Sequence, residues 1–265
     1  MKNEDYLKYN KESWNARTEH HFNSGFYEVD AFKQGKNMLN SIELDLLGDI
    51  KGKSVLHLQC HFGQDTLSLA RIGAKVTGVD FSEEAIKKAK QLNDDLKLDA
   101  RFICCDVYTL PQHLNEQFDI VFTSYGVIGW LPDMNKWAGV ISHFLKPGGK
   151  FVMAEFHPVV WMFDNDFSKV EYNYFKADAI VETENGTYAD KSAPIKTTTI
   201  SWNHGLAEVL EALLKNGLRL NKIQEFDYSP YPCFNHVVET EPGKWHIKHI
   251  GNRIPMVYAL VAEKL

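Results

Sequence analysis

The alternation of apolar and polar positions over residues 53–82 predicts a strand, a tight turn, a helix and a second strand. Residues 54–58 form the continuous apolar run of a buried parallel strand, and residues 66–72 have helix-forming composition. Residues 76–79 form the next strand, with Asp80 at its carboxyl end. In such a βαβ unit, free N–H groups of the helix and an acid at the strand tip bind a nucleotide. An adenosine-containing cofactor is therefore the first inference.

The rest of the chain repeats and closes this unit. Apolar runs predict further strands, and a 3.6-residue spacing of apolar side chains predicts helices after Ser82 and Asp133, which can act as N-caps. We expect an α/β fold with a Rossmann-like seven-stranded sheet, mostly parallel with an antiparallel last strand, and helices on both faces. The further strands are predicted at residues 100–104, 118–124, 150–156, 218–226 and 256–262.

Two segments fall outside this regular pattern. Residues 1–50 are predicted to form an N-terminal helical arm that covers the site, because they carry an amphipathic helix and many aromatic side chains. Residues 51–265 form the main domain, and about 157–200 is a β-rich insertion after the fifth strand, with Asn185-Gly186 as a hairpin signal. The aromatic side chains of the insertion can form the roof of a substrate pocket or a simple hydrophobic cover.

Composition narrows the class of partner. The formal net charge of the 265 residues is −6, so no basic surface indicates nucleic acid or an anionic membrane. No segment approaches the roughly 20 apolar residues of a membrane span. The four cysteines form no CxxC pair. We expect a cytoplasmic protein that acts on a small molecule, and the sequence leaves its oligomeric state open.

Five motifs, in this order and spacing, make the chain resemble the class I S-adenosylmethionine-dependent methyltransferases of the small-molecule type. Each motif alone is weak, and together they are specific. The resemblance extends from about Trp14 to Leu265. The motifs are VLHLQCHFG at 55–63, VDFS at 79–82, CDV at 105–107, FDIV at 118–121 and LKPGG at 145–149.

The resemblance implies S-adenosylmethionine as the cofactor and a role for each strand tip. Asp80 is implied to bind the ribose hydroxyls, and Asp106 to bind the adenine amino group. Residues 59–63 are implied to lie along the methionine moiety. Asp80 is also expected from its position alone, as a carboxylate facing a helix N-terminus. The cofactor-binding residues that we expect are Leu58, Gln59, Cys60, His61, Gly63, Asp65, Thr66, Asp80, Phe81, Ser82, Cys105, Asp106, Val107, Ser124 and Tyr125.

The first motif departs from the family pattern. His57 stands where the family has an acid, and Gln59 and His61 stand where it has glycines, which permit a positive φ. Either the loop is reshaped and these side chains add polar contacts, or cofactor binding is weakened; the retained Gly63 and strand-tip acids favour the first alternative. A zinc site at His57 and His61 is not favoured, because no third ligand is near in sequence. We predict no metal.

Three residues are candidates for catalysis. His157 directly follows the fifth strand, and an imidazole with a pKa near neutrality can accept a proton from a nucleophile. A structural role before Pro158 fits His157 equally well. His61 is the rival base, and Tyr125 follows the fourth strand in the zone where the resemblance places contacts to cofactor and substrate.

The functional hypothesis is methyl transfer from S-adenosylmethionine to an oxygen, nitrogen or other nucleophile of a small molecule. A nicotinamide-dependent oxidoreductase is a less favoured alternative, because residues 59–64 lack the G-x-G-x-x-G fingerprint. A protein that binds S-adenosylmethionine or another metabolite without turnover is the second alternative, which the altered first motif keeps open.

Overall fold

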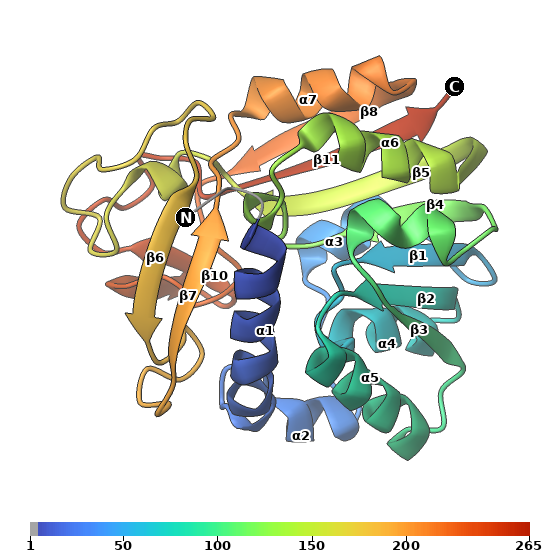
Figure 1. Ribbon diagram of the computed structural model, residues 1–265, viewed down its shortest axis with the longest axis horizontal. Coiled ribbons are helices and arrows are strands. Elements are labelled where there is room, and N and C mark those ends of the chain that lie inside the picture. The colour runs from blue at the N-terminus through green and yellow to red at the C-terminus, as the bar shows by residue number, and fades with distance from the viewer. Residues whose placement is uncertain (1–4) are drawn as a thin grey trace.

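The computed structural model describes residues 5–265, and a seven-stranded sheet forms its centre (Figure 1). The strand order is β3-β2-β1-β4-β5-β11-β8. β1 to β5 run parallel, while β11 is antiparallel to both β5 and β8, so the predicted fold class is confirmed. The strands are β1 (Ser54–Leu58), β2 (Lys75–Asp80), β3 (Ala100–Cys104), β4 (Phe118–Thr123), β5 (Leu145–Phe156), β8 (Leu218–Phe226) and β11 (Val257–Lys264).

Helices cover both faces of the sheet. On one face, α6 and α7 pack against the sheet in a core that includes Trp137 and Val209. On the other face, α3, α4 and α5 pack against the sheet in two further cores. The predicted N-caps are confirmed: Ser82 Oγ accepts from the N–H of Ala85, and the Asp133 carboxylate accepts from the N–H of Lys136. The helices are α3 (Ser41–Leu47), α4 (Gln64–Arg71), α5 (Glu83–Asp95), α6 (Met134–Phe144) and α7 (Leu206–Lys215), with short 3₁₀ turns η2 (Val107–Gln112), η3 (Ile128–Trp130) and η4 (Val160–Met162).

The N-terminal segment and the insertion meet beside the sheet. In Figure 1, α1 lies between α5 and the β6–β7 hairpin. The side chain of Asn10 both donates to the carbonyl of Ile200 and accepts from its N–H, each at 2.8 Å. On the other side, Ser82 Oγ donates to Asn15 at 2.7 Å. The elements are α1 (Tyr6–Asn23), α2 (Val29–Lys33), β6 (Ile180–Asn185) and β7 (Lys196–Ser201).

The structure differs from the predicted elements at three places. Residues 228–255 contain a second hairpin, β9 (Val237–Glu241) with β10 (Lys244–Ile247), that the sequence did not predict because its short strands are mostly polar and exposed. β6 ends at Asn185 as expected, but the connection to β7 is longer than a two-residue turn. β5 begins at Leu145, which pairs with Phe118, so the strand starts before the predicted Lys150.

The described helices also bear on membrane insertion. Among residues 5–265, no helix has both the length and the apolar composition needed to cross a bilayer.

Candidate active site

The loop after β1 has a glycine-type backbone, with the positive φ values that glycine favours, although two of the residues concerned are not glycine. Gln59 and His61 have φ values of 56° and 51°, and Gly63 has 79°. A Cβ at Gly63 would lie 2.7 Å from the ring of Phe102, so only glycine fits there. The Gln59 amide donates to the carbonyl of Val127 at 2.9 Å and ties this loop to the one after β4. Residues 59 and 61 therefore keep positive φ values, which does not agree with the reshaped loop of the first alternative, although the Gln59 side chain does make a polar contact of the kind that this alternative expected.

Asp80 anchors this loop from the tip of β2. Its Oδ2 accepts from the backbone N–H of His61 at 2.8 Å, and its Oδ1 accepts from the N–H of Ser82 at 2.9 Å. The carboxylate is 8% exposed, and burial raises its pKa to about 6 against the opposing effect of these hydrogen bonds. Each oxygen has a further lone pair, so the group can still accept hydrogen bonds from a diol.

Asp106 lies at the neighbouring strand tip. The N–H of Cys105 donates to the carbonyl of Asp80 at 3.0 Å, which places the two acids on adjacent strands. Asp106 caps η2 by accepting from the N–H of Tyr108 at 2.7 Å. Burial and the charge of Asp106 raise the pKa of Tyr6 to about 12, so the start of α1 lies close to this acid.

A third acid, Asp65, lies in the first turn of α4. Its Oδ2 accepts from Ser124 Oγ at 3.2 Å, and burial together with Glu43 raises its pKa to about 7. His57, in the place of the family's acid, pairs its Nδ1 with Thr66 Oγ1 at 2.8 Å. Burial lowers the pKa of His57 to about 3, so its imidazole is neutral and links β1 to α4. Within residues 5–265, no three His, Cys, Asp or Glu side chains are grouped as metal ligands.

Tyr125 belongs to a polar cluster that the arm helps to build. Its hydroxyl donates to Glu43 Oε2 at 3.0 Å, and Glu43 lies on α3. The ring of Tyr125 lies edge-to-face with that of Tyr231 at 5.3 Å. The side chain of Asn40 donates to the Tyr231 hydroxyl at 2.7 Å. The cluster therefore joins α3, the loop after β4 and the loop after β8.

Glu155 on β5 shapes the loop after β4, and sequence reasoning missed it. Its carboxylate is 1% exposed and accepts from the backbone N–H groups of Gly126, Val127 and Ile128. Three convergent N–H donors stabilise a buried carboxylate and fix the loop in return. The available signal was an acid inside the apolar run of the fifth strand.

His157 has a structural environment. One ring nitrogen, Nε2, pairs with Glu225 Oε1 at 2.9 Å, and the other, Nδ1, accepts from the N–H of Val159 at 3.2 Å. The backbone N–H of His157 donates to Met256. Burial lowers the pKa of His157 while Glu225 opposes this effect. With both nitrogens bonded, His157 has no free position for a substrate proton, and the structural alternative is favoured over the predicted role as a base.

The helix α1 buries a polar face that the sequence analysis did not identify. His21 is fully buried, and neither of its ring nitrogens has a hydrogen-bond partner. The ring of His21 lies 5.3 Å from that of His61 and 5.9 Å from that of Trp14. His61 Nε2 and Trp14 Nε1 are also buried and have no hydrogen-bond partner. The signal was polar residues at helical spacing. The buried polar residues of α1 are Asn10, Ser13, Arg17, Thr18 and His21.

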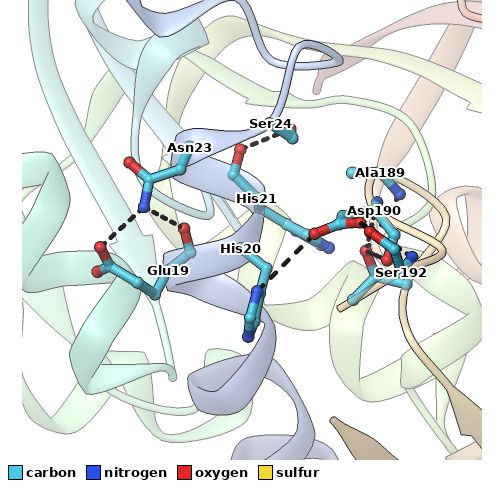
Figure 2. A network of polar contacts seen from close by, with 9 residues as sticks. Glu19, His20, His21, Asn23, Ser24, Ala189, Asp190 and Ser192 are labelled. Atoms are coloured by element: carbon cyan, nitrogen blue, oxygen red, sulfur yellow. Dashed lines mark hydrogen bonds and ion pairs between the residues drawn. The ribbon is translucent and has the colours of Figure 1, made fainter. Parts of the chain in front are cut away.

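Figure 2 shows how the end of α1 meets the insertion. His20 faces Asp190, in the connection between β6 and β7, with 3.9 Å between Nδ1 and Oδ2. Ser24 Oγ donates to the carbonyl of His21 at 2.7 Å and ends the helix. The hairpin therefore holds the end of the helix from which His21 projects.

The predicted site residues gather at one edge of the sheet, and their chemistry fits an adenosine cofactor. Asp80 and Asp106 offer carboxylates from adjacent strands, and Gln59, His61 and Trp14 carry buried polar atoms without a partner that a ligand can satisfy. Two surface depressions lie elsewhere, beside α5 and between η2 and α6. The predicted cofactor-binding residues lie at the carboxyl ends of β1 to β4, in the turns that follow, or at the starts of α4 and η2: Leu58, Gln59, Cys60, His61, Gly63, Asp65, Thr66, Asp80, Phe81, Ser82, Cys105, Asp106, Val107, Ser124 and Tyr125.

This strand order, with acids at the tips of β2 and after β3, defines a Rossmann-like domain of the class I methyltransferase type. The chain belongs to the methyltransferase domain family, which matches residues 49–212, and the resemblance stated from the motifs is confirmed.

Relatives and solved structures agree with this family. Phosphoethanolamine N-methyltransferase 1 of Triticum aestivum is 34% identical over 42% of this chain and 23% of its own length. Demethylmenaquinone methyltransferase of Lactococcus lactis is 31% identical over 66% of this chain and 69% of its own. The crystal structure of geranyl diphosphate C-methyltransferase from Streptomyces coelicolor, with S-adenosyl-L-homocysteine, superposes with a TM-score of 0.60 at 15% identity, over 98% of both chains. The chain thus spans less than a quarter of the wheat relative.

Proposed function

We propose that the protein is an S-adenosylmethionine-dependent methyltransferase that acts on a small molecule. The observation that carries this proposal is the pair of carboxylates, Asp80 and Asp106, on adjacent strand tips beside a β1 loop that keeps a glycine-type backbone. A diol and an adenine amino group of one nucleoside can reach such a pair at the switch between β1 and β4.

The residues have separate tasks in this proposal. Asp80 accepts from the ribose hydroxyls, and Asp106 accepts from the adenine amino group beside Val107. The backbone of residues 59–63, with Asp65, holds the methionine moiety. The bound cofactor supplies an electrophilic methyl group on a sulfonium. The protein therefore has to align the acceptor with that methyl and exclude water, which requires no covalent nucleophile.

The names of the relatives support a small-molecule acceptor, since they refer to phosphoethanolamine and demethylmenaquinone. The net charge of −6 gives no support for nucleic acid as a substrate. The four cysteines are free thiols, which fits the reducing cytoplasm that we propose as its location.

Isothermal calorimetry with S-adenosylmethionine, S-adenosylhomocysteine and NAD tests this function. We expect both sulfur-containing nucleosides to bind and NAD not to bind. Asp80→Ala should weaken their binding by about 1 to 3 kcal/mol through the loss of hydrogen bonds to a buried charged group. Asp99→Ala, which changes an exposed acid before β3, should leave the affinity unchanged. Binding of NAD alone would refute the assignment.

A further inference from the structure

The polar cluster around Tyr125 suggests what the acceptor is. We propose, on the basis of the proposed function, that the acceptor is an amine, protonated in solution, which is received among buried carboxylates and tyrosines. This acid–tyrosine cluster consists of Tyr27, Glu43, Asp65, Tyr125 and Tyr231.

The cluster brings five segments of the chain together next to the cofactor loop. Asp65 follows Gly63 by two residues and accepts from Ser124, the residue before Tyr125, at 3.2 Å. Burial, Glu43 and, to a smaller extent, Asp65 raise the pKa of Tyr125. Burial, Tyr188 and, to a smaller extent, Asp65 raise the pKa of Tyr27, and the carbonyl of Tyr27 accepts from Gln64 Nε2 at 2.9 Å. Asp65 thus lies next to Tyr125 through its bond to Ser124, and beside the loop assigned to the methionine moiety.

The carboxylates of this cluster have no positive partner. Glu43 is fully buried and accepts from neutral donors: the backbone N–H and side-chain amide of Asn40, and the Tyr125 hydroxyl. Asp65 accepts from the Ser124 hydroxyl. No ion pair found within residues 5–265 involves Glu43 or Asp65. A buried carboxylate without a counter-charge is costly, so the cluster favours a cationic ligand.

The guanidinium of Arg17, on α1, binds to another part of the structure. Arg17 Nη2 lies 3.8 Å from Glu184 and donates to Thr197 Oγ1 at 3.4 Å. Both partners belong to the β6–β7 hairpin, so Arg17 fastens α1 to the insertion. The cluster itself therefore keeps its negative character.

Aromatic rings and an unpartnered imidazole complete the surroundings. Phe26 lies 6.1 Å from Tyr231 and 5.2 Å from Tyr27, and aromatic faces attract cations. The fully buried His21 stacks on Tyr27 at 5.3 Å, and neither of its nitrogens has a partner. Burial and the charge of Arg17 lower the pKa of His21 to about 3, so it is a neutral hydrogen-bonding group that does not repel an ammonium. This second observation indicates a polar ligand at the same place.

The cofactor alone does not balance the cluster. Its ammonium and carboxylate cancel, and its sulfonium adds one positive charge, so it can compensate one of the carboxylates Glu43 and Asp65 and not both. Glu43, on α3, is the carboxylate that remains for the acceptor.

The chemistry needs no further reagent. The acceptor ammonium gives a proton to the Glu43 carboxylate and becomes an amine. The nitrogen lone pair then attacks the methyl carbon, while the carbon–sulfur bond breaks and its electron pair stays on sulfur. The methylated product is again an ammonium, and Glu43 releases its proton to solvent.

Calorimetry with cation and neutral pairs tests the inference without measuring turnover. The probes are choline against 3,3-dimethyl-1-butanol, and butylammonium against 1-butanol, each with the protein saturated with S-adenosylhomocysteine. We expect at least one cation to bind at least about tenfold more tightly than its neutral counterpart, because only the cation meets the carboxylates and ring faces.

Two variants locate the binding. Glu43→Gln keeps a side chain that can complete the capping box of α3, and Tyr231→Phe keeps the ring. Each should weaken the favoured cation about tenfold and leave S-adenosylhomocysteine affinity within about twofold. Glu171→Gln, at an exposed ion pair with Lys169, is the matched control and should change neither affinity.

The outcomes separate the two proposals. If S-adenosylhomocysteine binds but neither cation is preferred over its neutral partner, the amine acceptor is wrong and the methyltransferase proposal stands. If a cation is preferred but Glu43→Gln and Tyr231→Phe both bind it normally, the site is wrong. If S-adenosylhomocysteine does not bind the wild type, the proposed function itself fails.

Discussion

Replacing Asp80 by asparagine should make the protein without cofactor more stable near neutral pH and less able to bind the cofactor. The carboxylate is buried and accepts from two backbone N–H groups, those of His61 and Ser82. Burial raises its pKa from 3.8 to about 6, so the folded state binds a proton more readily than the unfolded state. The ionised carboxylate therefore lowers the free energy of unfolding.

The magnitude follows from proton linkage. A rise from 3.8 to about 6 means that the wild type loses about 3 kcal/mol of stability at this group as the pH rises from about 4 to about 7. Asparagine does not titrate. It has a single acceptor oxygen, so only one of the two backbone N–H groups keeps its hydrogen bond, a loss of about 1 kcal/mol. The variant should be less stable than the wild type by about 1 kcal/mol near pH 4 and more stable by about 2 kcal/mol near pH 8.

Urea denaturation of the cofactor-free protein at both pH values measures this difference. Asp99→Asn, which changes an exposed acid, is the control and should follow the wild type at each pH. Other buried acids titrate equally in variant and wild type, so the difference reports Asp80 alone. A stability difference between Asp80→Asn and wild type that is the same at both pH values would refute the reasoning.

Two further predictions concern the arm and the first motif. Asn10→Ala removes both hydrogen bonds to Ile200 and leaves its buried backbone groups unpaired, so thermal or urea denaturation should show a loss of about 2 to 3 kcal/mol; Asn23→Ala, at the exposed end of α1, serves as the control. Gln59→Gly removes the strain of a positive φ at a residue other than glycine, about 1 kcal/mol, but it also removes the hydrogen bond to Val127. The same assay should therefore show little net change in the free energy of unfolding. A loss above about 2 kcal/mol would show that the Gln59 side chain supports the loop more than the backbone strains it.

The strand tips could be predicted because their signal is local. A buried parallel strand is a short apolar run, and the residue after it reaches the carboxyl edge whatever the rest of the chain does. Asp80 and Asp106 are therefore located by sequence alone. The backbone at Gln59 and His61 could not be, because only tertiary contacts reveal that two large residues adopt the left-handed conformation of the glycines they replace.

The polar face that α1 buries could not be predicted from the sequence. Apolar periodicity identifies a helix by the face it buries in a hydrophobic core, and α1 buries Asn10, Ser13 and His21 instead. Glu155, an acid in the middle of a core strand, could not be identified for the same reason. Its role depends on three N–H groups in a loop about 28 residues away in sequence, which no local pattern encodes.

The buried polar groups at the sheet edge share one energetic consequence. Asp80 and Asp65 are ionisable groups in a desolvated setting, and His21 has two unpartnered nitrogens, so each makes the protein without ligand less stable. A ligand that hydrogen-bonds these groups removes those penalties only in the folded state. Such a ligand stabilises the fold by about 2.7 kcal/mol at a hundred times its dissociation constant. Because α1 contributes His21 and is held by the insertion, this stabilisation has to include the arm and the hairpin as well as the sheet.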